Sequence, residues 1–416
     1  MEDNVVPAGP VARPGDAPAG DGTYSTAGTS ETMRTDPLER LRTAAAAREA
    51  AGLRRALRPR TPTHDGLIDV ASNDYLGLSR DPRLIEAAVA AVRRWGAGST
   101  GSRLVTGSTR LHAELEERLA AFARAPRALV FSSGYLANLA AVATLGAGGL
   151  VVSDEGNHAS IIDACRLSRA RVAVTPHNDP AAVGKALAAR EEEHAVVVTD
   201  AVFSVDGDLA PIAELHEVAS RHGALLIVDE AHSLGVVGED GRGAVHAAGL
   251  ADAPDIVRTV TLSKSLGAQG GAVLGAPEIV DTLVDTGRAF IFDTGLAPAS
   301  VASALAALDI VSGHPDLPGR ARGNAVALAR AVRERGLPTL EPAAAVVRVV
   351  LGPPDAALAA AAVFAEHGVR AGCFRPPSVP SGRSCLRLTA RANLSSDDLA
   401  VIGRALTAVA EMKVSV

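Results

Sequence analysis

Short apolar runs alternate with segments of helical pattern between residues 110 and 290. Each run is four to six residues long, is dominated by small and branched apolar residues, and is bounded by turn residues. Such runs, mostly separated by helices, are typical of a mostly parallel sheet covered on both faces. The pattern predicts an α/β fold with a seven-stranded sheet in a large domain over residues 71–300. The predicted strands cover residues 128–131, 150–153, 172–175, 195–199, 224–228, 257–262 and 271–274.

The segments before this alternation have other patterns. Residues 1–35 are rich in Pro, Gly, Ala, Ser and Thr without periodicity, which predicts a disordered tail. An N-terminal arm over residues 36–70 follows, and its Arg/Ala/Leu pattern predicts an amphipathic helix over residues 38–58. We also expect a short strand over residues 66–71 and a helix over residues 82–95.

The region after residue 300 predicts a smaller α+β domain over residues 301–416. A long helical stretch comes first and is followed by shorter elements. These are strands over residues 346–351, 369–373 and 385–389, and helices over residues 354–367 and 396–411.

Composition narrows the class of function. The net charge is −6 with both signs interspersed, and aromatic residues make up 3%, so neither a basic patch nor a base-stacking surface is indicated. The three cysteines, Cys165, Cys373 and Cys385, are too widely spaced for a disulfide framework or a zinc site and fit a reducing cytoplasm. No apolar run reaches the roughly 18 residues of a membrane span, and no signal-peptide pattern is seen. We therefore expect a cytoplasmic protein without nucleic-acid or membrane partners.

Lysine is rare in this chain, and one of the few lysines follows a predicted strand. Only three of the 41 basic residues are Lys, and Lys264 comes directly after the run 257–262 and Ser263. An ammonium can lose its proton and form a Schiff base with an aldehyde, which a guanidinium in practice cannot do. An ordinary half-buried lysine is an equally open interpretation.

Other polar residues follow neighbouring strands, where ligands bind in parallel sheets. Asp229 follows the run 224–228, and a carboxylate there is costly to bury without a positive partner such as a protonated pyridine nitrogen. His232 comes three residues later and could contact the same ring. A surface aspartate and a structural histidine explain these two residues equally well.

Three further strand ends carry candidate residues. The segment 132–138 opens a predicted helix, whose free N–H groups could bind a phosphate or be simply capped. His158 could stack on a flat ring or cap a helix, and Ser204 is a candidate hydroxyl donor. Asp206 and Asp208 lack the spacing of a calcium loop and are typical of a turn.

Pyridoxal phosphate needs an anion for its ring nitrogen, an amine for its aldehyde and a seat for its phosphate. The strand ends offer all three, so the sequence predicts this cofactor and no metal. The match of residues 96–101 to G-x-G-x-x-G follows a predicted helix rather than a strand, which disfavours a dinucleotide site.

The chain resembles the α-oxoamine synthase family of fold-type I pyridoxal-phosphate transferases from about residue 40 to 410. The motifs that carry the resemblance are residues 72–78, 101–107, 157–168, 203–208, 229–238 (Asp-Glu-Ala-His-Ser-Leu-Gly-Val-Val-Gly) and 261–267 (Thr-Leu-Ser-Lys-Ser-Leu-Gly). The resemblance implies a homodimer with a shared active site. It also implies decarboxylative condensation of L-alanine with a pimeloyl thioester, carried by coenzyme A or by an acyl carrier protein.

The resemblance implies a role for each candidate residue. Lys264 would bind the cofactor aldehyde, Asp229 the ring nitrogen and His232 the ring oxygen, while His158 would stack on the ring. Gly134, Tyr135 and Ser204 would lie along the cofactor, Thr261 would hold its phosphate, and Thr294 would reach the phosphate across the dimer interface. Arg387 would bind the amino-acid carboxylate with Arg375 close by, and Arg54, Arg55 and Arg58 would approach the acyl substrate. A solvated helix face is the alternative for these last three arginines.

The sequence departs from the family pattern at two places. Asp293 stands where a hydroxyl residue is common, and the segment 389–393 lacks a histidine that many relatives carry. Alternatives are glycine C-acetyltransferase, 5-aminolevulinate synthase, a pyridoxal-phosphate aminotransferase and a cofactor-binding regulatory protein without turnover.

Overall fold

The computed structural model describes residues 36–57, 59–60 and 66–412. They fall into two compact units, one ending at Ala50 and one starting at Ala51. The first contains helix α1 (Glu39–Ala50), none of whose residues is buried. The predicted amphipathic helix over 38–58 is therefore wrong in extent and character, because the helix ends at Ala50 and Gly52 has φ +65°, a left-handed conformation that favours glycine. The predicted tail over 1–35 and Arg58 lie outside the described residues.

The second unit contains the predicted seven-stranded sheet, in the order β2-β8-β7-β6-β5-β3-β4. Strand β8 runs antiparallel to both of its neighbours, and the other pairings are parallel. Each predicted run is confirmed as a strand, with ends within one residue of those expected. The strands are β2 (Arg127–Phe131), β3 (Leu150–Asp154), β4 (Arg171–Thr175), β5 (Ala195–Asp200), β6 (Leu225–Asp229), β7 (Ile256–Thr261) and β8 (Gly271–Gly275).

Alternate residues of these strands enter two separate apolar clusters, as expected for a sheet covered on both faces. Val151 and Ile227, for example, face one cluster, whereas Val152 and Val228 face the other. The first cluster is completed by α4 (Gly134–Leu145), α5 (Ala159–Ser168), α9 (Pro277–Thr286) and α10 (Arg288–Ile291). The second is completed by α2 (Pro82–Trp95), α3 (Arg110–Ala123), α6 (Pro180–Ala188), α7 (Ile212–Arg221), α8 (Ala244–Ala247) and α11 (Pro298–Gly313).

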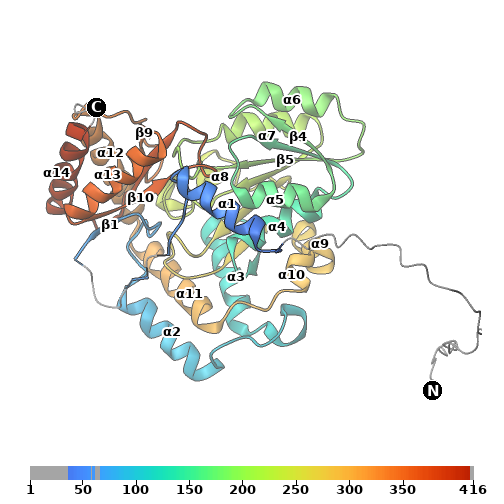
Figure 1. Ribbon diagram of the computed structural model, residues 1–416. Helices are drawn as coiled ribbons and strands as arrows, with labels where there is room; N and C mark the ends of the chain where they lie inside the picture. The colour runs from blue at the N-terminus through green and yellow to red at the C-terminus, as the bar shows by residue number, and fades with distance from the viewer. Residues whose placement is uncertain (1–35, 58, 61–65, 413–416) are drawn as a thin grey trace, which may run out of the picture. The chain divides into compact units, whose positions relative to one another are not determined.

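A smaller four-stranded sheet has the order β1-β10-β11-β9. Its strands are β1 (Ile68–Val70), β9 (Val346–Gly352), β10 (Val369–Phe374) and β11 (Ser384–Thr389). The helices α12 (Asp316–Arg333), α13 (Pro354–Glu366) and α14 (Ser396–Met412) gather around it (Figure 1). The elements expected after residue 300 are thus confirmed, and β1 joins them from an earlier part of the chain. None of the helices in the described ranges is both long and apolar enough to span a membrane.

Candidate active site

The carboxyl ends of β5, β6 and β7 bring the central candidate residues together. Asp200 and Asp229 are the last residues of their strands and are direct neighbours in the parallel register. Lys264 lies three residues beyond the end of β7, and its Nζ is 2.8 Å from Nε2 of His232. Because this contact is made inside the protein, the lysine does not extend to solvent from the strand end. The prediction that amine, imidazole and carboxylate meet at one edge of the sheet is confirmed.

Asp229 is a buried and oriented carboxylate, which excludes the interpretation as a surface aspartate. Its side chain accepts hydrogen bonds from Asn138 Nδ2 at 2.6 Å and from the Ala231 backbone at 2.9 Å. Asn138, on α4, is itself fixed, because its carbonyl oxygen accepts from the Thr259 hydroxyl at 2.6 Å. A buried carboxylate held in this way is suited to pair with a cation.

A chain of hydrogen bonds links Lys264 to the smaller sheet. Tyr75 Oη lies 2.5 Å from Nδ1 of His232, and Arg387 Nη2 donates to the same hydroxyl at 3.3 Å. Burial, reinforced by the positive charges of Lys264 and Arg387, holds the pKa of His232 well below its ordinary value. The ring is therefore neutral. If Nε2 accepts from Lys264, Nδ1 carries the proton and donates to the Tyr75 oxygen.

Burial lowers the pKa of Lys264 to about 8, from an ordinary value of 10.5. This pKa of about 8 includes the charges nearby, since Asp229 and Asp200 favour the charged amine and Arg387 disfavours it. A substantial fraction of the amine is neutral near this pH, which is the form that attacks an aldehyde.

This pKa predicts how fast the apoprotein captures pyridoxal phosphate. The rate is expected to rise with pH and to level off above about pH 9, because the neutral fraction of Lys264 is half at its pKa of about 8 and nearly complete about one pH unit higher. Stopped-flow absorbance would measure the rate, with Nα-acetyl-lysine as the control for the pH dependence of the free aldehyde. A rate that follows the control up to pH 10 would contradict the lowered pKa.

His158 caps α5, as one of its two interpretations predicted. Its Nδ1 accepts from the Ser160 backbone at 3.2 Å and lies 2.7 Å from the Ser160 hydroxyl, while its own backbone N–H donates to Asp200 at 3.0 Å. Burial lowers the pKa of His158, although Asp229 opposes this effect. The cap uses one ring nitrogen, and the predicted stacking of the ring on the cofactor stays a prediction.

The expected phosphate seat lies at the start of α4. Ser133 caps this helix by accepting from the Leu136 backbone, and the first N–H groups of a helix have no partner within it. Gly134 approaches Thr261 closely, since a Cβ atom on it would lie 3.1 Å from the Thr261 Cβ. The hydroxyls of Thr261 and Ser263 are 2.7 Å apart at the same place. The helix end and two hydroxyls thus form a cradle that a larger residue at position 134 would fill.

Tyr135 and Thr294 are less tightly placed. Tyr135 follows Gly134 in α4 and donates to Asp163, with its side chain partly exposed. Thr294 is exposed and pairs with Ser102 in an isolated bridge. Asp293, the residue that departs from the family pattern, accepts a hydrogen bond from Ser132 and so holds this segment beside the end of β2.

Arg387 on β11 is 3% exposed and stacks on Phe374, with its guanidinium carbon 5.5 Å from the ring centroid. Its Nε is buried and makes no hydrogen bond within the part of the chain that the structure describes. A buried guanidinium with an unmatched donor fits a carboxylate ligand. Its connection to Lys264 through Tyr75 and His232 brings a residue of the smaller sheet beside the carboxyl ends of the larger sheet.

The other predicted arginines that the structure describes, Arg54, Arg55 and Arg375, gather beside this site rather than in it. Arg375 donates to the backbone oxygens of Gly52 and Arg54, and Arg55 donates to Ser378 at 3.3 Å. They line a cavity of about 820 Å³ whose walls also include Arg60, Leu67, Leu358, Arg370 and Phe374. Phe374 also packs against Arg387, so the cavity and Arg387 are neighbours.

Several site residues were not singled out from the sequence. They are Tyr75, Asn138, Ser160, Asp200 and Thr259. Asp200 has the same strand-end position as Asp229, which was a usable signal. Burial, followed by the charge of Asp229, raises the pKa of Asp200 well above its ordinary value.

The residues present fit pyridoxal phosphate. A buried carboxylate, an amine of lowered pKa and a helix N-terminus with hydroxyls supply the three contacts that this cofactor needs. When bound, the cofactor supplies an electron-accepting ring for reactions at the α-carbon of an amino acid.

Comparisons with known proteins agree with this site. The family model described as aminotransferase class I and II matches residues 65–406. The 8-amino-7-oxononanoate synthase of Mycolicibacterium gilvum is 60% identical over 363 residues, covering 87% of this chain and 94% of the relative. That of Mycobacterium avium is 58% identical over 378 residues, covering 91% and 98%.

Similar solved structures agree with these sequence relatives. A Sphingomonas wittichii serine palmitoyltransferase matches with a TM-score of 0.85 and 30% identity, covering 92% of this chain and all of the other. The 8-amino-7-oxononanoate synthase of Francisella tularensis has a TM-score of 0.72 and 27% identity, covering 85% and 99%. A serine palmitoyltransferase solved with pyridoxal phosphate also matches, with a TM-score of 0.85. The chain therefore belongs to the aminotransferase class I and II family, and within it to the α-oxoamine synthases, enzymes whose cofactor is pyridoxal phosphate.

Proposed function

We propose that this enzyme is an 8-amino-7-oxononanoate synthase of biotin biosynthesis. It condenses L-alanine with a pimeloyl thioester and releases 8-amino-7-oxononanoate, carbon dioxide and the free thiol carrier. The observation that carries the proposal is the 60% identity, over 87% of the chain, to a relative of that name. The linked Lys264, His232, Tyr75 and Arg387 supply the groups for this chemistry.

Each residue has a task in this reaction. Arg387 binds the carboxylate of alanine and orients the α-carbon toward Lys264. The Lys264 amine removes the α-proton, because its lowered pKa makes the neutral base available near pH 8. Asp229 holds a proton on the cofactor ring nitrogen, and this positive charge draws electrons away from the α-carbon. The carboxylate leaves as carbon dioxide once the acyl group has been transferred.

The cavity lined by Arg54, Arg55 and Arg375 supports a site for the acyl substrate. It combines guanidinium groups with the apolar side chains of Leu67 and Leu358. An acyl thioester has an apolar chain and, in coenzyme A or a carrier protein, phosphate groups that guanidiniums bind well.

Exposed apolar residues near Thr294 support a homodimer. Phe292 is 71% exposed, Leu104 53% and Val105 78%, and all three lie in segments that flank the bridge between Ser102 and Thr294. Apolar side chains exposed so close together are typical of an interface. A dimer formed there would bring Thr294 to the phosphate of the partner, and we expect the protein to act in the cytoplasm.

Mass spectrometry of the products tests the proposal. The purified protein with pyridoxal phosphate is offered L-alanine with pimeloyl-CoA, glycine with acetyl-CoA or succinyl-CoA, and L-serine with palmitoyl-CoA. We expect the first pair to react about 100-fold faster than the others. The expected ratio is of this size because only a few contacts in the site distinguish one amino acid and acyl group from another. A preference for either glycine pair would make the protein a glycine C-acetyltransferase or a 5-aminolevulinate synthase. Formation of pyruvate from L-alanine without release of carbon dioxide would indicate an aminotransferase. The absence of any product would indicate a cofactor-binding protein without turnover.

A further inference from the structure

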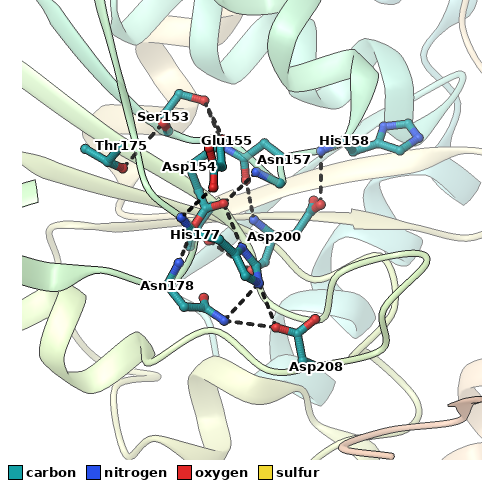
Figure 2. A network of polar contacts seen from close by, with 12 residues as sticks. Ser153, Asp154, Glu155, Asn157, His158, Thr175, His177, Asn178, Asp200 and Asp208 are labelled. Carbon is teal, nitrogen blue, oxygen red and sulfur yellow. Dashed lines mark hydrogen bonds and ion pairs between the residues drawn. The ribbon is translucent and has the colours of Figure 1, made fainter. Parts of the chain in front are cut away.

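His177, in the loop between β4 and α6, lies between two carboxylates (Figure 2). Its Nδ1 is 3.0 Å from Asp154 Oδ1, and its Nε2 is 2.8 Å from Asp208 Oδ2. Carboxylates accept hydrogen bonds, and a neutral imidazole has only one N–H to donate. With both carboxylates ionised, a protonated ring is needed to make the two contacts at once, so the geometry favours an imidazolium at this position. Asn178 Nδ2 lies 3.2 Å from the same Nε2.

The first carboxylate shapes the loop that carries His158. Asp154 accepts from the Gly156 backbone and from the Asn178 backbone, both at 2.7 Å. The next residue of the loop, Asn157, accepts from the Asp200 backbone at 2.9 Å, and Asp200 in turn accepts from the backbone of His158. Figure 2 shows this path, with the His158 ring pointing away from the cluster.

The second carboxylate belongs to Asp208, whose backbone closes the turn that carries Ser204. The backbone oxygen of Asp208 accepts from Phe203 at 3.0 Å, and the Phe203 ring packs edge-on against His177 with centroids 4.3 Å apart. On its other side the turn is held by an ion pair between Asp206 and Arg348 of the smaller sheet. His177 thus links the Ser204 turn to the His158 loop. Asn178 forms a second bridge beside it, because its backbone donates to Asp154 at 2.7 Å and its Nδ2 donates to Asp208 at 3.0 Å.

We infer that His177 is a positioning residue for the cofactor site, whose protonated ring holds the Ser204 turn against the His158 loop. The inference rests on pyridoxal phosphate as cofactor and on the roles proposed for His158 and Ser204. It does not depend on which amino acid or acyl group the enzyme uses. The competing explanation is that the contacts of His177 with Asp154 and Asp208 only stabilise the fold.

The charges around the ring make the link sensitive to pH. The groups that face it are Asp154, Asp208 and Glu155, whose carboxylate accepts from the His177 backbone at 3.3 Å. Burial opposes protonation, but the two bonded carboxylates outweigh it, so the pKa of His177 is raised above the ordinary 6.5. The link is therefore complete below pH 6.5 and is lost as the pH rises through the raised pKa.

The test measures the Kd of the apoprotein for pyridoxal phosphate between pH 6 and 9, by absorbance titration. For His177→Ala we expect a Kd about tenfold higher than that of the unchanged protein at pH 6, because a charge-assisted bridge is lost. The difference should shrink as the pH rises, since the unchanged protein then loses the same bridge. Comparison at each pH cancels the separate effect of the Lys264 amine.

His216→Ala is the matched control, because His216 also bonds a carboxylate, Asp255 at 2.8 Å, but at the opposite edge of the sheet from the site. Asp208→Asn is the second variant and should reproduce the effect if His177→Ala fails to fold. Equal Kd values for both site variants and the unchanged protein would overturn the inference. A loss that is independent of pH, or a lower melting temperature with unchanged Kd, would show a structural ion pair only. Failure to form the proposed product would leave this Kd measurement intact.

Discussion

Replacing Lys264 with alanine is expected to lower kcat by at least about 10⁴-fold, because the residue serves both as the attachment point of the cofactor and as the base. The protein should stay folded. Burial lowers the pKa of Lys264 to about 8, so folding disfavours the charged amine. This cost sets in below the ordinary pKa of 10.5 and is complete below about pH 8, and the substitution removes it.

Borohydride reduction followed by peptide mass spectrometry would locate the bound cofactor in the same experiment. We expect it on Lys264 in the unchanged protein and in the control Lys185→Ala, whose lysine lies exposed in α6. No labelled peptide is expected from Lys264→Ala. Turnover by that variant without an added amine, or labelling at another residue, would contradict the assignment of Lys264 as the residue that binds the cofactor.

Replacing Asp229 with asparagine is expected to lower kcat by about 10³-fold, since a preorganised charge at the reacting system is lost. An asparagine can still accept the hydrogen bond from Asn138 through its carbonyl oxygen. Its amide then replaces the oxygen that accepts from the Ala231 backbone, so this hydrogen bond is lost, and the neutral side chain can no longer hold a proton on the cofactor ring nitrogen. The fold should be retained because the new side chain has nearly the same shape.

Steady-state kinetics would measure kcat of the variant, and cofactor titration would measure its binding of pyridoxal phosphate. Asp281→Asn is the control, because Asp281 pairs with Arg127 at the surface and is 62% exposed. We expect this control to match the unchanged protein. A kcat of Asp229→Asn within about threefold of normal would be too small for loss of a charge that acts on the reacting atoms.

The fold and the centre of the site could be predicted because both depend on local sequence. Each strand is a short apolar run, and Asp229 and Lys264 lie at or within three residues of a strand end. Parallel strands that are neighbours deliver such residues to one edge, so proximity follows from the topology. The helix expected over 38–58 failed for a related reason: its residue pattern did not show that the chain turns at Gly52.

The contacts that hold the central residues could not be predicted. Tyr75 meets His232 across 157 positions of sequence and Arg387 across 312. Asn138 meets Asp229 across 91 positions, and no local pattern marks any of these three pairs. His158 shows a different limit, since capping a helix and stacking on a ring use different parts of one imidazole and do not exclude each other.

The most direct test of the proposed alanine site is the absorbance spectrum of the cofactor-loaded protein during titration with L-alanine and then with glycine. We expect a cofactor band that shifts to saturation with L-alanine and barely responds to glycine. The Arg387→Lys variant should need an L-alanine concentration about tenfold or more higher for the same shift, because a bidentate contact with the carboxylate is lost. A glycine-selective shift would contradict the proposed substrate. The absence of any band after addition of pyridoxal phosphate would contradict the site around Lys264 itself.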